Sequence, residues 1–295
     1  MTKVTLIWTG ILFALLWSSA SAATKIGLQS AQPFVMAVTR FFIAGIILLL
    51  FAHGIYKYRF PQKKEWRQII IYGMLNVSIY LGLYVLAMQR VSAGLGTMAV
   101  GINPVIISFF SMLLFGHKVT QKNVLSLLLC SAGVLIAAYP LFKNSYATVD
   151  GIVILLVSML AYSAGAIYYA RKKWSDLHII TINGWQTIFG GLLLLPVALL
   201  TYQQQKNNFD FRFWGATLWL AIPVSIGAVQ CWMILLKQNA VNAAYWLYLC
   251  PVFGFLIASL LLKEPISWYT ATGVFLVIGG LYILQASKLR IYKIK

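Results

Sequence analysis

The chain has 295 residues, of which 61% are hydrophobic and only 9% are charged. A soluble domain carries about 25% charged residues, so this composition excludes a soluble globular protein and indicates an integral membrane protein with several spans. The formal net charge is +18, and we expect the basic residues to face anionic lipid headgroups. The expected partner of the protein is therefore the lipid bilayer and not a nucleic acid.

Ten apolar runs follow one another along the chain, each close to the ~20 residues that cross a ~30 Å hydrocarbon core. The expected spans are 4–24, 33–52, 68–88, 92–115, 122–141, 150–170, 179–201, 213–236, 241–262 and 267–286. The predicted fold class is therefore an all-α integral membrane protein with ten transmembrane helices.

The loops between these runs alternate in charge. With the N-terminus placed in the cytoplasm, the inner segments carry sixteen Lys and Arg residues and the outer loops carry six. Such a bias is the positive-inside signal of membrane proteins. It predicts a multi-pass protein of the cell (inner) membrane with both termini in the cytoplasm.

The two halves of the chain share residues at a nearly fixed offset. Pro251 lies 147 positions after Pro104, and Tyr162 lies 145 positions after Trp17. Matches of this kind across separate apolar runs indicate an internal repeat. The expected units are a first five-helix repeat at 1–145, a second at 146–287 and a basic cytoplasmic tail at 288–295. An odd number of spans inverts the second copy in the membrane, which is an architecture of secondary transporters.

The first run has a second interpretation. Lys3, an apolar stretch and the small residues 20–23 resemble a secretory signal peptide with its cleavage site. Its removal would leave nine spans and take away the partner of the sixth. Because the repeat includes Trp17, we assign the first run to the transmembrane bundle.

Polar and aromatic side chains recur inside several runs. Asn76, Tyr80 and Tyr84 are four residues apart, which places them on one helix face. Polar groups in hydrocarbon are stable where they face the bundle interior. The expected substrate-binding residues are Trp17, Arg40, Asn76, Tyr80, Tyr84, Asn103, Trp185, Gln186, Gln230, Tyr245 and Tyr248. An aromatic cavity with amide groups suits organic solutes that have an apolar part and a polar part.

Each of these residues has a simpler explanation when it is taken alone. Ser, Thr and Asn often only join neighbouring helices, and Tyr or Trp near a span end belongs to the aromatic belt. Arg40, the one basic residue well inside a span, is expected to bind a substrate carboxylate, to reach the interface or to bond carbonyls of a neighbouring helix. The sequence does not decide among these three roles of the Arg40 side chain.

Two prolines are candidate hinges. Pro104 and Pro251 lie at equivalent places in spans four and nine. A proline inside a helix frees a backbone carbonyl and permits a bend. The bends are expected to act as gates, with a static kink as the alternative.

Groups that carry chemistry are scarce at membrane depth. All five acidic residues and all three histidines fall at span ends or in loops, so no carboxylate is placed to relay protons or hold sodium. The three cysteines lie in apolar runs without metal-ligand spacing and are expected to pack as small core residues. No Walker, GxSxG or HExxH motif occurs. We therefore expect no enzyme, no metal and no cofactor.

Several short motifs occur together in the predicted spans. They are Trp17-Ser18, Arg40-Phe41, Ala44-Gly45, Pro104, Pro251, Glu264-Pro265, Gly273 and Gly279-Gly280. In this combination the chain resembles the drug/metabolite transporter superfamily, in its ten-span EamA-type family. The resemblance implies inner-membrane carriers, mostly exporters of amino acids, other small metabolites or toxic compounds, with helices five and ten outside a central cavity. His117 departs from the family, which often has Glu at this place, as at Glu264 after the ninth helix.

The expected function is a membrane carrier that exports small organic solutes, with amino acids or related metabolites first among them, by alternating access. One alternative is a membrane-embedded enzyme or lipid-handling protein that uses the same cavity. Another is a non-transporting membrane subunit that packs through its glycine-bearing helices. For each of these three functions, we expect the protein to be a monomer or a homodimer.

Overall fold

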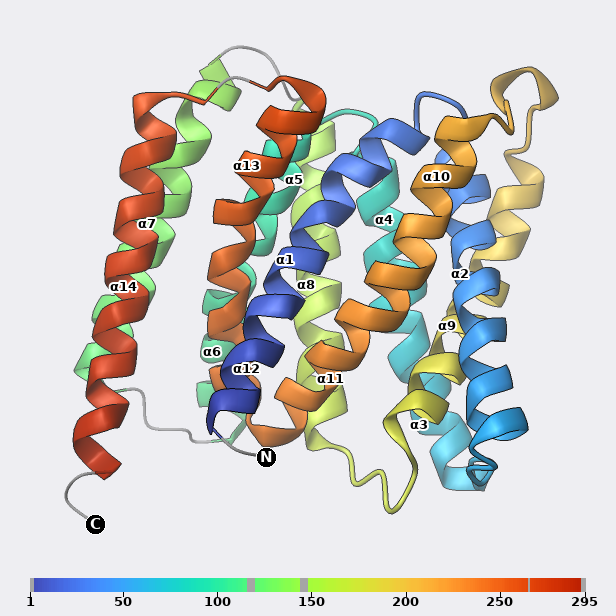
Figure 1. The fold of residues 1–295 in the computed structure, drawn as a ribbon, viewed down its shortest axis with the longest axis horizontal. Helices are drawn as coiled ribbons and strands as arrows, with labels where there is room; N and C mark the ends of the chain where they lie inside the picture. The colour runs from blue at the N-terminus through green and yellow to red at the C-terminus, as the bar shows by residue number, and fades with distance from the viewer. Residues whose placement is uncertain (1–2, 116–119, 144–147, 265, 293–295) are drawn as a thin grey trace.

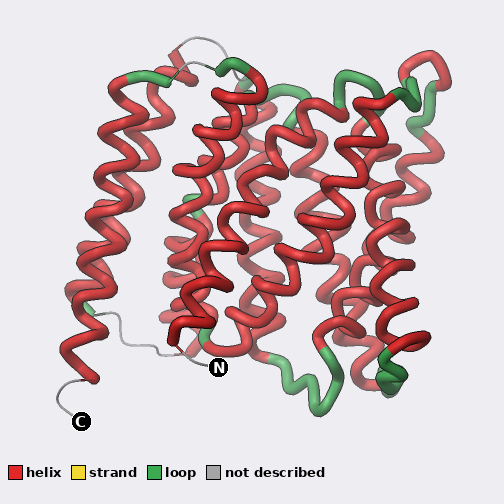
Figure 2. The backbone as a smooth tube through the Cα atoms, in the orientation of Figure 1, coloured by secondary structure: helices red, strands yellow, loops and turns green. Residues whose placement is uncertain are grey.

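Ten apolar helices form the computed structural model, which describes residues 3–115, 120–143, 148–264 and 266–292. In these ranges every regular element is helical, and the loops are short (Figure 2). Eight helices are long and apolar enough to cross a membrane. Two shorter apolar helices, Gln121–Ala137 and Trp268–Gly280, bring the number to the predicted ten.

The first five spans are built from nine elements. They are α1 (Lys3–Gly27), α2 (Pro33–Leu49) with the π-helical η1 (Leu50–Ile55), α3 (Lys63–Gly73) with the π-helical η2 (Met74–Ile79) and α4 (Tyr80–Ala87), α5 (Ala93–Val100) with α6 (Asn103–Phe115), and α7 (Gln121–Lys143). Spans two, three and four are therefore not continuous α-helices.

The last five spans follow the same plan. They are α8 (Val149–Arg171), α9 (Ile179–Leu200), α10 (Phe211–Trp219) with the π-helical η4 (Leu220–Ala228) and α11 (Val229–Gln238), α12 (Ala240–Ala244) with the 3₁₀-helical η5 (Tyr245–Tyr248) and α13 (Leu249–Leu262), and α14 (Trp268–Tyr292). A short 3₁₀ turn, η3 (Gln204–Lys206), lies in the loop before α10.

The second half crosses the bundle upside down relative to the first. In Figure 1, α1 begins on the same face of the bundle on which α14 ends. We call this the terminal face and the other the opposite face. Helix α1 runs from the terminal face to the opposite face, whereas α8 runs the other way. The two five-helix halves are thus inverted, as predicted.

Irregular backbone occurs at equivalent places in the two halves. Moving η2 forward by 147 positions places it at 221–226, inside η4. Moving the break between α5 and α6 forward by the same amount places it at the junction of η5 and α13. Segments of π-helix and 3₁₀-helix inside long helices often mark functional hinges.

The two prolines follow these breaks directly. Pro104 is the second residue of α6, and Pro251 is the third residue of α13. The first turn of a helix has no internal partner for its N–H groups, so a proline there costs no hydrogen bond. Each interruption therefore begins just before a proline.

Spans four and nine cross each other through small residues. A methyl group on Gly101 would lie 3.1 Å from Pro251 Cγ, and one on Gly254 would overlap the side chain of Thr97. Close approach of two helices in a membrane depends on such small residues. The two candidate hinges therefore belong to one contact between the repeats.

Helices α7 and α14 pack on each other at one edge of the bundle (Figure 1). A methyl group on Gly133 would lie 2.5 Å from the Gly273 carbonyl oxygen. The Ser126 hydroxyl donates a 2.7 Å hydrogen bond to the Gly280 carbonyl. Spans five and ten are thus peripheral, as predicted. However, these glycines face each other within the chain and not a partner protein.

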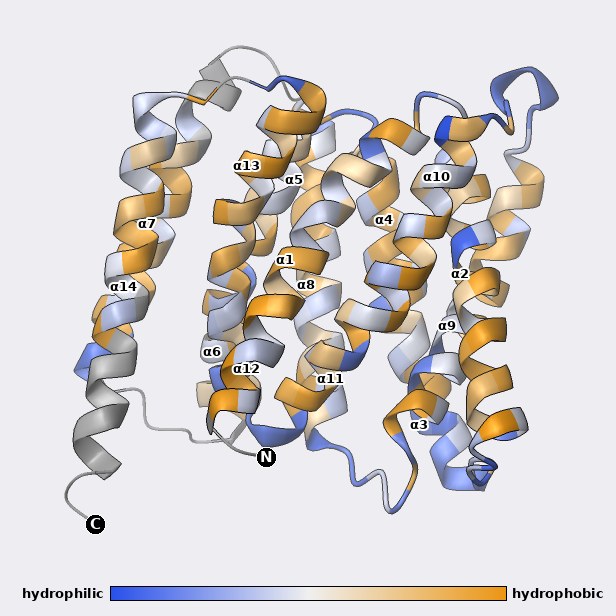
Figure 3. Ribbon diagram, viewed as in Figure 1, coloured by the Kyte–Doolittle hydropathy of each residue, from blue (hydrophilic) through white to orange (hydrophobic). Residues whose placement is uncertain are grey.

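The outside of the bundle is apolar. Leu199, Phe275 and Leu50 expose between 62% and 77% of their surface. Figure 3 shows apolar residues along the outward turns of α2 and α13, and hydrophilic residues gathered at the loops of both faces. A surface with such large exposed apolar areas is suited to the hydrocarbon of a bilayer and not to water.

Candidate functional site

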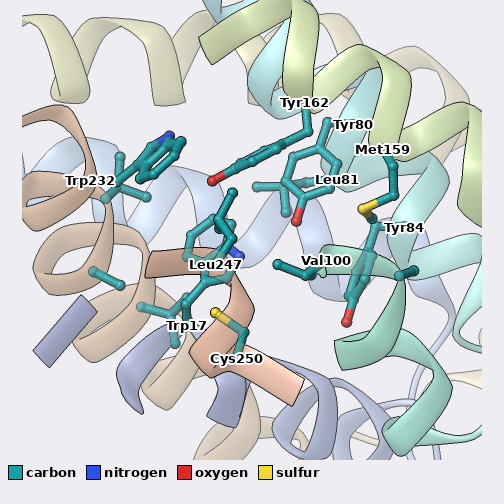
Figure 4. Packing of buried hydrophobic residues seen from close by; sticks show 14 of the residues in the cluster. Trp17, Tyr80, Leu81, Tyr84, Val100, Met159, Tyr162, Trp232, Leu247 and Cys250 are labelled. Carbon is teal, nitrogen blue, oxygen red and sulfur yellow. The ribbon is translucent and has the colours of Figure 1, made fainter. Parts of the chain in front are cut away.

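A group of aromatic rings lies at the centre of the bundle. The ring of Tyr80 in α4 is 4.7 Å from Tyr162 in α8 and 6.3 Å from Trp17 in α1. The Trp232 ring in α11 lies 5.6 Å from Tyr162. Figure 4 shows these four rings turned toward one another, with the Tyr162 hydroxyl directed into the group. Both repeats therefore supply side chains to one aromatic site.

This aromatic site lies on the axis that relates the repeats. Trp17 and Tyr162 are equivalent residues of the two halves, and their rings are 6.0 Å apart. Two equivalent residues can touch only where the two-fold axis passes between them. Val100 and Leu247 are also equivalent and face the same group (Figure 4). A central site shared by inverted repeats is the arrangement found in secondary transporters.

A buried polar network lies beside the rings. The Arg40 Nε donates to the Ser225 hydroxyl at 2.8 Å, and the Asn183 amide donates to the Ser225 carbonyl at 3.0 Å. The Gln186 amide donates to Asn183 Oδ1 at 2.9 Å, and Asn76 donates to Gln186 Oε1 at 3.3 Å. All five side chains are buried. The network joins α2, η4, α9 and η2, and so includes both π-helical segments of spans three and eight.

Several buried donors around the rings have no partner among the residues that the structure describes. They are Arg40 Nη2, the Tyr162 hydroxyl and Trp232 Nε1. An unpaired buried donor costs about 1–3 kcal/mol, so such groups are typical of sites that bind a polar ligand. Arg40 lies in α2, which packs against α4, the helix that carries Tyr80 and Tyr84.

The burial of Arg40 excludes one of the three roles considered for its side chain. The side chain exposes only 6% of its surface, so it does not reach the membrane interface. Its partner on the neighbouring helix is a serine hydroxyl and not a carbonyl. A guanidinium with free N–H groups can bind a carboxylate through two parallel bonds.

Two further predicted residues hold helices together near the rings. The Tyr84 hydroxyl and the Ser21 hydroxyl are 2.6 Å apart, which joins α4 to α1. Asn103 donates to the Val100 carbonyl at 3.1 Å and accepts from the Ser163 hydroxyl at 2.9 Å, which joins α6 to α8. The polar atoms of Asn103 are therefore engaged within the protein.

Trp185 lies apart from the central rings, near the terminal face. Its indole N–H donates to His53 Nε2 at 3.0 Å, and the Trp66 ring packs edge-on at 4.8 Å. His178 borders the same face, where burial and the nearby Lys237 charge lower its pKa. This cluster joins η1 and α3 to α9, and the structure does not bring Trp185 to the rings.

Tyr248 points toward the edge of the bundle. Its hydroxyl lies 3.5 Å from the Ser131 hydroxyl of α7, and the Tyr245 ring lies 6.4 Å from the Tyr248 ring. Both tyrosines belong to η5, the short 3₁₀ segment next to Pro251. They therefore lie next to the candidate hinge of span nine. The half-buried Gln230 lies on α11, which also carries Trp232.

Sequence reasoning missed two ring residues of the site. Tyr162 is the repeat equivalent of Trp17, so the offset of 145 positions could have identified it. Trp232 carries no such signal, because its place beside Tyr162 depends on how α11 packs against α8.

A polar cavity of about 670 Å³ opens on the opposite face. Its lining includes Lys25, Gln29, Arg90 and Glu264. The Glu264 carboxylate accepts hydrogen bonds from the backbone N–H groups of Ala93 at 2.8 Å and Gly94 at 2.9 Å. These groups begin α5, so the loop of the second repeat caps a helix of the first. Residue His117, the counterpart of Glu264, lies outside the described residues.

Replacing Glu264 by alanine is expected to loosen the opposite face. Two N–H groups of α5 would lose their acceptor, and each charge-assisted bond is worth about 1.5–3 kcal/mol. A Met88→Cys reporter in the cavity lining should then react several-fold faster with a membrane-impermeant maleimide. Asp210→Ala is the control, because Asp210 caps its own helix α10. An unchanged labelling rate would show that Glu264 does not hold this face closed.

Together, a ten-helix bundle of inverted repeats and a polar aromatic site on their axis define a membrane transporter. The profile of the EamA-like transporter family matches residues 4–139 and again 150–285, once for each repeat. The chain belongs to the EamA-like transporter family.

Relatives and a solved structure agree with this assignment. An uncharacterized transporter of Synechocystis is 25% identical, over 94% of this chain and 88% of its own length. Protein PecM of Dickeya dadantii is 27% identical, over 91% of this chain and 88% of its own. A solved crystal structure with 20% identity covers 98% of this chain and 99% of its own at a TM-score of 0.78, which shows a shared fold. The expectation of a transporter and not an enzyme is thereby confirmed.

Proposed function

We propose that the protein carries small organic solutes with an apolar part and a carboxylate, such as amino acids or related metabolites, out of the cell. The carrier binds its solute at the rings of Trp17, Tyr80, Tyr162 and Trp232. The observation that supports this most is the aromatic site on the repeat axis, with buried unpaired donors beside it. Rings supply apolar contact, and a few placed donors supply orientation.

The polar network supports an anionic group on the solute. Arg40 is the only basic residue well inside a span, and one of its terminal nitrogens is unpaired and buried. Bringing a charge into the bundle costs several kcal/mol unless the charge meets a partner. A solute carboxylate would satisfy this nitrogen, while its side chain packs against the rings.

Alternating access would use the interrupted helices. The breaks before Pro104 and Pro251 lie at equivalent places and share one contact through Gly101. Bending at one break while the other straightens would open the central site to one face at a time. In this proposal the terminal face is cytoplasmic, because the positive-inside bias places both ends of the chain there.

The direct test is transport by the purified protein. The full chain is reconstituted in liposomes of phosphatidylethanolamine and phosphatidylglycerol, and radiolabelled amino acids are supplied outside. Saturable uptake that is stimulated by the same unlabelled amino acid inside supports the carrier. Chemical change of the solutes without movement, or no saturable movement of any of them, would refute it.

A variant tests the site itself. Tyr80→Ala removes the ring that contacts both Trp17 and Tyr162. It should raise the concentration of solute needed for half-maximal transport by roughly tenfold, since aromatic contacts of this size are worth about 1–2 kcal/mol including burial. An unchanged value for every transported solute would leave Tyr80 as a packing residue.

A further inference from the structure

A groove opens toward the bilayer between α1, α10 and α13. Its volume is about 550 Å³. Helix α1 forms the floor from Leu15 to Ile26, and residues such as Trp219 and Leu261 form the walls. Leu261 and Trp219 expose 62% and 46% of their surface. The groove is separate from the aromatic site, because its lining contains none of the four rings.

The length of the groove matches one leaflet of a membrane. Leu15 and Ile26 are eleven residues apart on α1, which corresponds to roughly 16 Å along the helix. Half of a ~30 Å hydrocarbon core is about 15 Å. Ile26 lies next to the end of α1 at Gly27, on the opposite face. The groove therefore runs from that interface to about the middle of the bilayer.

The deep part of the groove is suited to hydrocarbon. The Trp219 indole N–H donates to the Ser19 hydroxyl at 2.8 Å, and this hydroxyl donates to the Leu16 carbonyl at 2.7 Å. These two polar side chains are thus paired, and the indole ring is held as a fixed wall. No heavy atom of the part of the chain that the structure describes lies within 4 Å of where a side chain on Gly215 would begin. The lack of a side chain there keeps the groove open.

A basic residue stands where a lipid headgroup would lie. Arg212 is the second residue of α10, is exposed and lines the groove. Among the described residues, its guanidinium makes one long hydrogen bond, 3.4 Å to Gln29 Oε1. The neighbouring carboxylate of Asp210 accepts from the Phe213 N–H at 2.9 Å and caps α10. Arginine binds phosphate oxygens through two parallel N–H bonds, and donors remain for this.

We propose that this groove binds an anionic phospholipid from the leaflet of the opposite face. One acyl chain lies along α1 past Gly215, and the phosphate is held by Arg212. The charge at the interface end and the apolar length below it together select the lipid. This site would hold a resident lipid, and it does not depend on the solute that the central site carries.

Native mass spectrometry of the purified full chain tests the proposal. The probes are palmitoyl-oleoyl phosphatidylglycerol and palmitoyl-oleoyl phosphatidylethanolamine, each added in equal amount. We expect the wild type to retain phosphatidylglycerol about fivefold better, since one basic residue near the surface is worth about 1 kcal/mol for an anionic lipid. Arg212→Gln should bring the ratio close to one. Gly215→Trp should lower the retention of both lipids several-fold, because the indole would fill the groove.

Two control variants separate the groove from general effects. Gly279→Trp adds the same side chain at another glycine with open surroundings and should leave the retention of both lipids unchanged. Lys263→Gln removes a positive charge from a loop on the same face and should preserve the preference for phosphatidylglycerol. The proposal is overturned if the wild type shows no preference. It is also overturned if Gly215→Trp retains both lipids like the wild type, or if Lys263→Gln abolishes the preference as Arg212→Gln does.

Discussion

Replacing Gly273 by leucine is expected to separate α7 from α14 and to lower the thermal stability of the protein strongly. A side chain at Gly273 would run into the Gly133 carbonyl and the backbone nitrogen of Ala137. Backbone atoms cannot move aside without moving the helix. Overpacking a well-packed contact costs typically 1–3 kcal/mol, and about 2–4 °C of Tm is lost per kcal/mol in chains of some 200 residues. We expect Tm in detergent to fall by roughly 5 °C or more.

The chain itself offers a matched control. Gly279 lies on the same helix, and no heavy atom of the described residues is within 4 Å of where its side chain would begin. Gly279→Leu adds the same volume and should leave Tm within about 1 °C of the wild type. Equal losses for both variants would show that leucine disturbs α14 itself and not its contact with α7. Gly133→Leu, made from the other helix, should reproduce the loss seen with Gly273→Leu.

Replacing Arg40 by glutamine is expected to abolish the transport of solutes that carry a carboxylate. The variant keeps a donor near Ser225 but removes the charge and the second N–H edge that a carboxylate would bind. Truncating one partner of a buried charge pair costs 2–5 kcal/mol or more, which corresponds to at least about a thirtyfold loss. The measurement is the initial rate of counterflow in proteoliposomes.

Two comparisons isolate the charge of Arg40. Amino-acid amides lack the carboxylate, so their transport should change much less in Arg40→Gln. Ser225→Ala removes the hydroxyl that accepts from Arg40 Nε but leaves the guanidinium, and should retain most of the carboxylate transport. If acids and amides lost activity equally while the protein remained folded, Arg40 would be a structural residue of the network.

The sequence was sufficient for the ten spans and for the inversion of the second repeat. The length of each apolar run predicts a span, and the fixed offset between matching residues predicts the repeat. Both can be taken directly from the order of residues in the chain. Pro104 and Pro251 indicated bends in spans four and nine, because a proline inside a helix frees a backbone carbonyl. The segments of π-helix and 3₁₀-helix could not be predicted from the sequence. The π-helical η2 of span three, for example, contains no proline.

The candidate site was less predictable, for reasons that particular residues make clear. Neighbouring positions on a helix point about 100° apart, so Gln186 enters the central network while Trp185 faces His53. Trp185 is also the repeat equivalent of Arg40, and inversion places it near the terminal face. Asn103 has partners in adjacent turns and on α8, a contact that depends on packing and not on spacing.

At the central rings and again at the edge of the bundle, a residue contacts its own repeat equivalent. The Cys130 thiol lies 3.5 Å from the carbonyl of Val277, its own repeat equivalent, just as Trp17 meets Tyr162. These two contacts mark the line about which the halves are exchanged. In each contact the two members come from different halves, so a substitution at Trp17 changes the surroundings of Tyr162 and thereby acts on both halves at once.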